Sequence, residues 1–158
     1  LQANLYKSLF LKLLFVCGRF TLKTPVGHWL LELFGDSAWD AWPTWSARFN
    51  IAPTQPIVCI ANSDTCMTLP HAQRQRLRPG LECFDARWGL LPAWARDAKI
   101  GNSMINARCE TLLEKPAFKR AAREQRCVVM ADGYFEWMKL PDKSKQPFWL
   151  HRYEENPF

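Results

Sequence analysis

The strongest constraint on the fold of this chain is a hairpin pattern near its C-terminal end. The stretch ADGYFEWMKL turns at residues 131–133 and then runs out as a strand over residues 134–140. Residues 146–151 run back, and the turn-rich sequence PDKS joins the two runs. Because a short hairpin pairs its strands antiparallel, this pattern predicts a mainly antiparallel sheet.

Other short runs extend the same picture. Strand-like segments cover residues 17–22, 55–61, 81–88 and 127–130. Thr24 and Pro25 open a helix that ends at Gly35, and residues 112–126 form a second helical pattern with Pro116 near its first turn. Strands thus outnumber helices, and 158 residues suffice for one domain. We expect a single α+β domain with a mainly antiparallel, barrel-like sheet and a few flanking helices.

The composition favours a globular protein with an anionic partner. Hydrophobic residues make up 48% of the chain, which excludes a disordered protein. The net charge is +6, and the chain has 8 Trp, whose flat faces suit stacking on bases. The basic residues concentrate at two places, 74–78 and 115–126, and each cluster taken alone is better read as a solvated face than as a binding surface.

The cysteines point away from metal and disulfide chemistry. None of the 6 Cys forms a CxxC pair, and the 3 His are scattered, so the sequence predicts no structural zinc site. The spacing also lacks the density of a disulfide-stapled secreted domain, which favours a reducing cytoplasmic environment. No cofactor is implied.

Residues 1–16 form an apolar leader before Cys17. Lys12 interrupts the apolar stretch, no small-residue cleavage site follows, and the stretch is too short to span a membrane. Val16 would be the initiator Met if its codon is a GTG start, as in bacteria. We therefore interpret residues 1–16 as absent from the mature protein, and residues 17–158 as the N-terminal part of a single domain.

Four further stretches carry the polar residues expected of a site. They are ARFNIAPTQ at 47–55, ARWGLLPAW at 86–94, INARCET at 105–111 and ADGYFEW at 131–137. Each alone is weak, because a Glu on a strand commonly faces solvent and an Asn in such a stretch is often a local cap.

Together and in this order, the stretches CGRF, RFNIAPTQ, WGLLPAW, INARCETLLEKPAF, RCVVMADGYFEW and KQPFW resemble the SOS response-associated peptidase (SRAP) family. The resemblance runs from Cys17 to the C-terminus. It implies a DNA-damage protein that captures abasic sites in single-stranded DNA as a covalent DNA–protein crosslink. The corresponding enzyme class is a peptidase, hydrolase or lyase.

The resemblance also implies roles for individual residues. Cys17 would be the N-terminal nucleophile, whose amine and thiol together form a thiazolidine with the sugar aldehyde. Glu136 would move protons, and Asn106 would bond near the sugar. The residues implied in DNA contact are Arg19 and Arg108 for phosphates, Trp88 and Trp137 for bases, and Asn50 either there or in the pocket's architecture.

The sequence departs from the family at several places. Met130 stands where Pro is common, and the family's catalytic His, in an H-x-R-M-P-like motif, has no counterpart, since His151 is followed by Arg152 and Tyr153. We therefore expect a C-terminally incomplete domain, poorly stable and weakly active alone. Residues Arg74, Arg76 and Arg78 match no family motif.

Two other functions stay open. One is a cysteine peptidase or amidohydrolase that uses Cys17 with Glu136, acting in self-processing. The other is a non-covalent binder of single-stranded DNA, whose affinity would fall with salt and not depend on Cys17. We expect a monomeric protein of the bacterial cytoplasm, associated with the nucleoid and not with a membrane.

Overall fold

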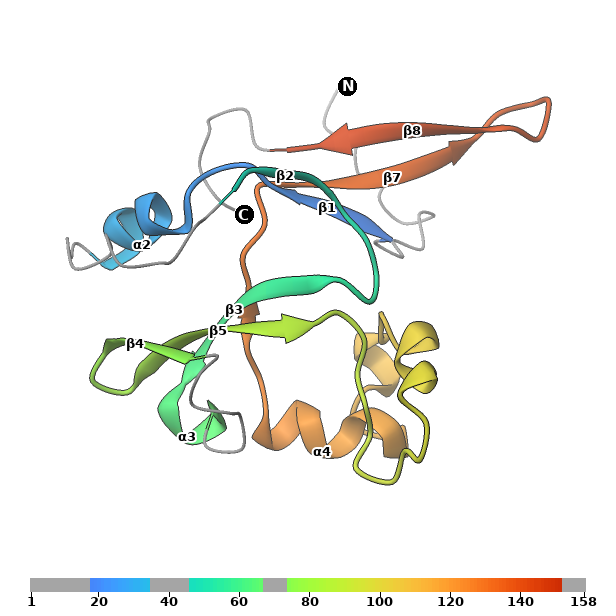
Figure 1. Ribbon diagram of the computed structural model, residues 1–158. Coiled ribbons are helices and arrows are strands. Elements are labelled where there is room, and N and C mark those ends of the chain that lie inside the picture. Colours follow the sequence, from blue (N-terminus) through green and yellow to red (C-terminus); the bar gives the residue numbers. More distant parts are fainter. Residues whose placement is uncertain (1–17, 35–45, 67–73, 152–158) are drawn as a thin grey trace, which may run out of the picture.

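The computed structural model describes residues 18–34, 46–66 and 74–151 (Figure 1). Cys17 lies outside these ranges. The strands are β1 (Arg19–Leu22), β2 (Arg48–Ile51), β3 (Pro56–Asn62), β4 (Arg74–Arg78), β5 (Leu81–Arg87), β6 (Val128–Val129), β7 (Gly133–Lys139) and β8 (Lys145–Leu150). The helices are α2 (Val26–Phe34), α3 (Ser63–Cys66), α4 (Pro116–Glu124) and the 3-10 helices η2 (Ala98–Ser103) and η3 (Cys109–Thr111).

The strands form two four-stranded sheets, in the orders β2-β1-β7-β8 and β4-β5-β3-β6. Figure 1 shows the first sheet above the second, with α4 below both. The strand pairings of the described residues are antiparallel. The prediction of a mainly antiparallel α+β fold is therefore confirmed.

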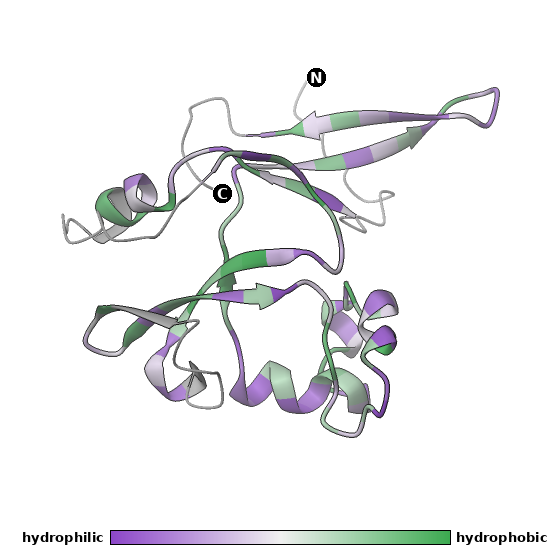
Figure 2. Cartoon of the chain, in the orientation of Figure 1, coloured by the Kyte–Doolittle hydropathy of each residue, from purple (hydrophilic) through white to green (hydrophobic). Residues whose placement is uncertain are grey.

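One apolar core joins the two sheets. It takes Phe20 and Leu22 from β1, Trp29 and Leu30 from α2, and residues 57–61 of β3, and all of these side chains are buried. In β3 five consecutive residues are buried, which fits a strand packed on both faces, and Figure 2 shows the apolar colouring of this strand. The described residues thus share one core, as expected of one domain.

The chain crosses from the second sheet to the first at residues 130–132, and a buried carboxylate holds that crossing. Asp132 accepts a 2.5 Å hydrogen bond from the Thr21 hydroxyl. Its other oxygen accepts from the backbone N–H groups of Lys23 (2.6 Å) and Thr24 (2.8 Å). Three donors compensate the burial of this charge and fix the end of β1 and the entry to α2.

Close packing requires a glycine at position 133, next to Asp132. A Cβ at this position would overlap the indole of Trp149 and lie 3.0 Å from Oγ1 of Thr21. The Trp149 indole N–H donates to the same Thr21 hydroxyl at 3.3 Å. Only a residue without a Cβ lets β7 start this close to its neighbours.

Most helices and strands lie within a few residues of the positions predicted from the sequence. The β7–β8 hairpin, β3, β5 and α2 lie where they were predicted. The helix predicted over residues 112–126 begins at Pro116, because Lys115, the residue before proline, has an extended backbone (φ −69°, ψ 120°). The strands β2 and β4 were not predicted, since β2 has only four residues and β4 has one apolar residue, Leu77, among its five.

We expect the substitution Asp132→Asn to lower the free energy of unfolding by about 2–4 kcal/mol. Asn has the same shape, but one of its two terminal atoms is an NH₂ group that faces a hydrogen-bond donor. In the other orientation of the amide, the N–H groups of Lys23 and Thr24 have a neutral and therefore weaker acceptor. Urea denaturation measures the change. Asp64→Asn, at an exposed aspartate, is the matched control and should change stability little. Equal stability of the two variants would contradict the role of Asp132.

Candidate active site and nucleic-acid interface

Glu136 projects from β7 towards the interior. It is two residues from Tyr134, which packs against the core, so both side chains lie on the same face of the strand. Oε1 of Glu136 is enclosed and has no hydrogen-bond partner among the described residues. Burial raises the pKa of this carboxyl, and a hydrogen bond from the backbone N–H of Trp137 opposes the shift. A carboxyl with a raised pKa is better suited to giving and taking a proton than a solvated glutamate is.

The start of β1 lies beside Glu136. Arg19 pairs with Phe135, the residue before Glu136, and Phe20 pairs with Tyr134. A Cβ on Gly18 would lie 3.9 Å from Cζ3 of Trp137, so the backbone of Gly18 runs close to this indole. Cys17, which is bonded to Gly18, lies outside the described residues. The predicted residues Arg19, Glu136 and Trp137 therefore lie at the same end of the β1–β7 pair, with Arg19 and Trp137 on the face of the sheet opposite Glu136.

Asn50 holds the side chain of Arg19. The Arg19 guanidinium donates to Oδ1 of Asn50 at 2.8 Å across the β1–β2 pair. Asn50 is exposed and Arg19 is half-buried. Of the two roles considered for Asn50, this contact supports the architectural one, in which Asn50 orients a cation that faces solvent.

The corner after Asn50 explains the stretch RFNIAPTQ. The Gln55 side-chain oxygen accepts from the Arg48 guanidinium (3.0 Å) and from the backbone N–H of Ala52 (3.1 Å). Arg48 also donates to the carbonyl of Pro56. Thr54 takes a positive φ of 73° in this turn. The motif therefore builds a tight corner between β2 and β3, and sequence reasoning missed the part that Gln55 plays in it.

Trp88 links this corner to the loop that carries Asn106. Its indole N–H donates to the carbonyl of Ile105 at 2.9 Å, and its ring lies 5.2 Å from the ring of Phe20 on β1. Its backbone exchanges hydrogen bonds with Thr54 (2.8 Å) and Gln55 (3.0 Å). Trp88 is half-buried. These contacts place the Asn106 loop next to β1 through one aromatic side chain.

A close approach of two glycines shapes the same loop. Gly89 has φ 136° and would clash with the carbonyl of Gly101 if it carried a Cβ. The backbone N–H of Leu90 donates to the carbonyl of Met104 at 3.0 Å. The stretch WGLLPAW thus packs directly against η2, which precedes Asn106.

Asn106 and Arg108 lie on the surface beside α4. Both side chains are exposed. They line a hollow of about 380 Å³ together with Ala107, Thr111, Leu112, Lys115 and Phe118. Lys115 and Phe118 belong to the cap and first turns of α4, and sequence reasoning did not connect them with Asn106 or Arg108. A hollow with an amide, a guanidinium and an ammonium is suited to a polar anion such as a sugar phosphate.

The other residues singled out from the sequence lie elsewhere. Arg74, Arg76 and Arg78 are on β4 at the edge of the second sheet. His151 stacks on Trp149 with ring centroids 4.1 Å apart, and Nζ of Lys23 lies 5.4 Å from the Trp149 ring. This arrangement engages the ring of His151 in packing, in agreement with its departure from the family motif.

Two cysteines of the second sheet interact. Cys59 of β3 pairs with Val129 of β6, and Cys127 precedes that strand by one residue. A hydrogen bond from the Cys59 thiol lowers the pKa of Cys127 to about 7, although burial opposes the shift. The same bond and its own burial raise the pKa of Cys59. Cys127 is exposed at the surface, and exposure together with a lowered pKa favours reactivity of a thiol.

Within the described ranges, no helix has the length and apolar character needed to cross a membrane. In the same ranges, no group of three or more His, Cys, Asp or Glu side chains is arranged to hold a metal ion.

Comparison with known proteins identifies the family. The profile described as SOS response associated peptidase (SRAP) matches residues 16–158. The chain belongs to the SRAP family. The family resemblance inferred from the six ordered motifs is thereby confirmed.

Curated relatives of this SRAP chain are named for abasic sites. It is 37% identical over 132 residues to abasic site processing protein YoaM of Bacillus subtilis, covering 84% of this chain and 52% of YoaM. It is 36% identical over 143 residues to YoqW of the same bacterium, covering 90% of this chain and 57% of YoqW. HMCES of Xenopus tropicalis is 29% identical over 122 residues, or 70% of this chain and 34% of HMCES. The chain thus spans little more than half the length of the two bacterial relatives.

A solved structure shows the same fold. The crystal structure of a phage-related protein from Bordetella bronchiseptica superposes with a TM-score of 0.60 and 24% sequence identity. The alignment covers 89% of this chain and 57% of that protein.

The raised pKa of Glu136 predicts a pH-dependent stability. Because the folded pKa lies above the unfolded value, the folded protein holds this proton more tightly, so the free energy of unfolding falls as pH rises between the two values. Glu136→Gln removes the cost of burying the ionised carboxyl. The variant should melt like the parent at acidic pH and at a higher temperature near neutral pH, as measured by circular dichroism.

Glu114→Gln, at an exposed glutamate, is the control for the loss of one negative charge. A difference between Glu136→Gln and the parent that stays constant with pH would contradict the desolvation of Glu136.

Cys127 should be alkylated by iodoacetamide with a pH midpoint of about 7, below the usual value of about 8.5 for a free cysteine. Peptide mass spectrometry after short labelling pulses measures the midpoint, with the exposed Cys109 as an internal reference. Cys59→Ala should raise the Cys127 midpoint, because it removes the thiol that stabilises the thiolate. An unchanged midpoint in that variant would rule out the Cys59 hydrogen bond as the cause.

Proposed function

We propose that this protein captures abasic sites in single-stranded DNA covalently, through Cys17 as its N-terminal residue. Membership of the SRAP family and relatives named abasic site processing proteins support this proposal. The observation that carries it is structural. β1 begins beside Glu136, whose carboxyl is partly desolvated. Cys17 is bonded to Gly18, so it directly precedes a segment that lies next to this candidate acid–base group.

The reaction uses both nucleophiles of an N-terminal cysteine. The ring-opened sugar of an abasic site presents an aldehyde. The α-amine of Cys17, with a pKa of about 7.7–8.0, attacks it and forms an imine with loss of one water. The thiol then adds to the imine carbon, and its proton passes to the nitrogen, which closes a five-membered thiazolidine. Ring closure is intramolecular and therefore fast.

Glu136 serves this chemistry as a proton shuttle. Imine formation needs an acid to protonate the departing hydroxyl of the carbinolamine, and a base to take the proton from the amine. A carboxyl whose pKa is raised by burial holds a proton at a higher pH than a solvated glutamate does. The enclosed, unpartnered Oε1 is the atom we assign to this transfer.

The surrounding residues hold the DNA. Arg19, oriented by Asn50, and Arg108 are placed to bind phosphates, and Asn106 to bond the sugar in the same hollow as Arg108. Trp137 is 37% exposed and offers a face for a neighbouring base. Trp88 supports the site by holding the Asn106 loop against β1, through its N–H bond to Ile105 and its ring contact with Phe20.

We also propose that the protein works as a monomer in the bacterial cytoplasm, at the nucleoid, where single-stranded DNA with abasic sites would be found. The protein would act in the DNA damage response by shielding the lesion.

A denaturing gel tests the capture directly. The gene is expressed with Met at position 16, followed by Cys17 and all coding sequence downstream, and the product is mixed with single-stranded DNA that carries one abasic site. A band that resists denaturation is expected for the parent and not for Cys17→Ala. Glu136→Gln should crosslink at a rate lower by about 100-fold or more, as expected for loss of an acid–base group. Cys109→Ala, at an exposed cysteine that has no part in the proposed reaction, should crosslink like the parent.

A second variant isolates the α-amine. One alanine inserted before Cys17 keeps the thiol but places the Cys17 nitrogen in a peptide bond, so it should form no thiazolidine. If this variant crosslinks as well as the parent, the thiazolidine mechanism is wrong. If the parent itself forms no crosslink, with Cys17 confirmed at its N-terminus by mass, the proposed function fails and peptidase or plain DNA-binding activity takes its place.

A further inference from the structure

We propose that the exposed basic face of α4 is a second DNA contact surface, which binds the phosphate backbone of the strand where it leaves the reaction site. This inference rests on the proposed function for its substrate and adds a surface that the reaction itself does not need. We define the basic face as the exposed side chains Lys115, Lys119, Arg123 and Arg126.

The helix separates its apolar and basic residues cleanly. Ala117, Phe118, Ala121 and Ala122 are half-buried, at the spacing that gathers on one side of a helix. Lys119, Arg120, Arg123 and Glu124 are exposed on the other side. Figure 2 shows the resulting alternation of apolar and polar colouring along α4. The helix therefore rests on the domain by its apolar side and presents its charges outwards.

The basic residues form a row with little compensation. Lys119 and Arg123 are four residues apart, so their side chains lie on one line, about 6 Å apart along the axis, and Lys115 is the residue that caps the N-terminal end of the helix. Like charges at this spacing destabilise a helix. The only acidic residue from 115 to 126 is Glu124, and it pairs with Arg120 at 2.9 Å. An anionic ligand would relieve this repulsion.

The row begins at the candidate site. Lys115 lines the same hollow as Asn106 and Arg108, the two residues that we assign to the sugar and its phosphate. From Lys115 the basic face continues along α4 away from that hollow. A strand held at Arg108 thus meets a continuous series of cations, which suits a polyanion with regularly spaced charges rather than a single small anion.

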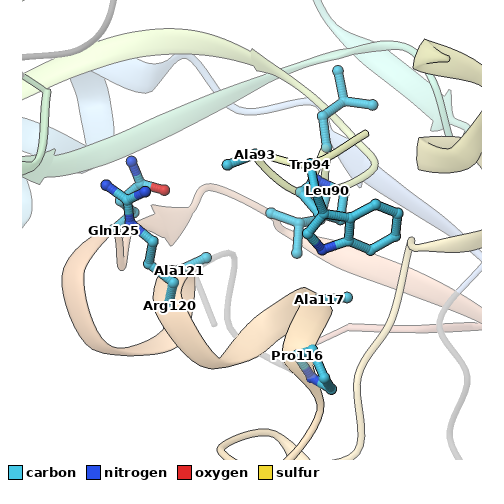
Figure 3. A pocket seen from close by; sticks show the side chains of 10 residues that line it. Leu90, Ala93, Trp94, Pro116, Ala117, Arg120, Ala121 and Gln125 are labelled. Atoms are coloured by element: carbon cyan, nitrogen blue, oxygen red, sulfur yellow. The ribbon is translucent and has the colours of Figure 1, made fainter. Parts of the chain in front are cut away.

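The opposite flank of α4 offers an aromatic surface. A second hollow of about 270 Å³ lies between α4 and the WGLLPAW loop and is lined by Leu90, Leu91, Pro92, Ala93, Trp94, Pro116, Ala117, Arg120, Ala121 and Gln125. Figure 3 shows the Trp94 indole over the Pro116–Ala117 end of the helix, and Arg120 with Gln125 at the other end. Trp94 is 58% exposed. An exposed indole beside a basic helix is the combination that single-stranded nucleic acid binds, through base stacking and phosphate contacts.

The test compares two pairs of charge-neutralising substitutions in the full chain. The first, Lys119→Gln with Arg123→Gln, removes two charges from the basic face and leaves the Arg120–Glu124 pair intact. The second, Lys139→Gln with Lys145→Gln, removes two charges from facing positions in the β7–β8 hairpin, which Figure 1 shows at the opposite end of the molecule from α4. Both variants have the same net charge.

Binding is measured by fluorescence anisotropy with oligonucleotides that carry a tetrahydrofuran analogue, which lacks the aldehyde and cannot crosslink. The α4 variant should bind about tenfold more weakly, and its slope of log K against log salt should be shallower by about 1.4, since each lost phosphate contact accounts for about 0.7. The hairpin variant should keep the parent slope. Equal effects of the two variants would overturn the proposal, because they would report net charge alone.

The position of the analogue sharpens the result. Oligonucleotides with the analogue at the 5′ end or at the 3′ end extend the strand in opposite directions from the site. The α4 variant should weaken binding to only one of the two, because α4 lies on one side of Asn106 and Arg108. An equal loss for both would overturn the proposal as well.

Crosslinking separates this inference from the proposed function. If the parent fails to crosslink true abasic DNA but the α4 variant still loses affinity and slope, the proposed function fails and the α4 surface stands. If the parent crosslinks through Cys17 and the α4 variant binds like the hairpin variant, the function stands and the α4 surface is overturned.

Discussion

The structure depends on one buried carboxylate. Asp132 lies where the chain passes from one sheet to the other, and its oxygens accept hydrogen bonds from Thr21, Lys23 and Thr24. These bonds set the end of β1 in relation to the start of β7, and therefore the register in which Arg19 lies opposite Phe135. The relative position of β1 and Glu136 follows from that register. Glu136, to which we assign the proton transfer in the proposed function, is thus positioned by a carboxylate that has no part in the proposed reaction.

A second set of contacts connects the sheets at the other end of the site. Trp88 packs on Phe20 and bonds to Ile105, so one side chain fixes both the β1 strand and the Asn106 loop. The backbone bonds of Trp88 to Thr54 and Gln55 attach the β2–β3 corner to the same point. Four stretches that are distant in sequence therefore meet around one indole. This explains why the motifs of the SRAP family are spread along the chain and yet act together.

Much of the fold and of the candidate site could be predicted from the sequence. The rest could not, for physical reasons. The β7–β8 hairpin was predictable because turn residues and alternation are local signals. Glu136 and Asn106 were predicted as site residues from the order of the motifs. Their environment was not predictable, since the burial of one carboxyl oxygen depends on strands far apart in the chain. Asp132 was read as a turn residue, because only the folded structure brings Thr21 to it. Likewise, the proximity of Lys115 to Asn106 has no local signature.

The hairpin that carries Glu136 has an open outer side. β8 is the edge strand of its sheet among the described residues, its side chains are exposed, and its Phe148 is paired with Glu136. Edge strands open more readily than central ones. Fraying of β8 would admit water to Glu136, and its proton would then be released at a lower pH. On heating, β8 would therefore loosen and change the proton affinity of Glu136 before the core melts.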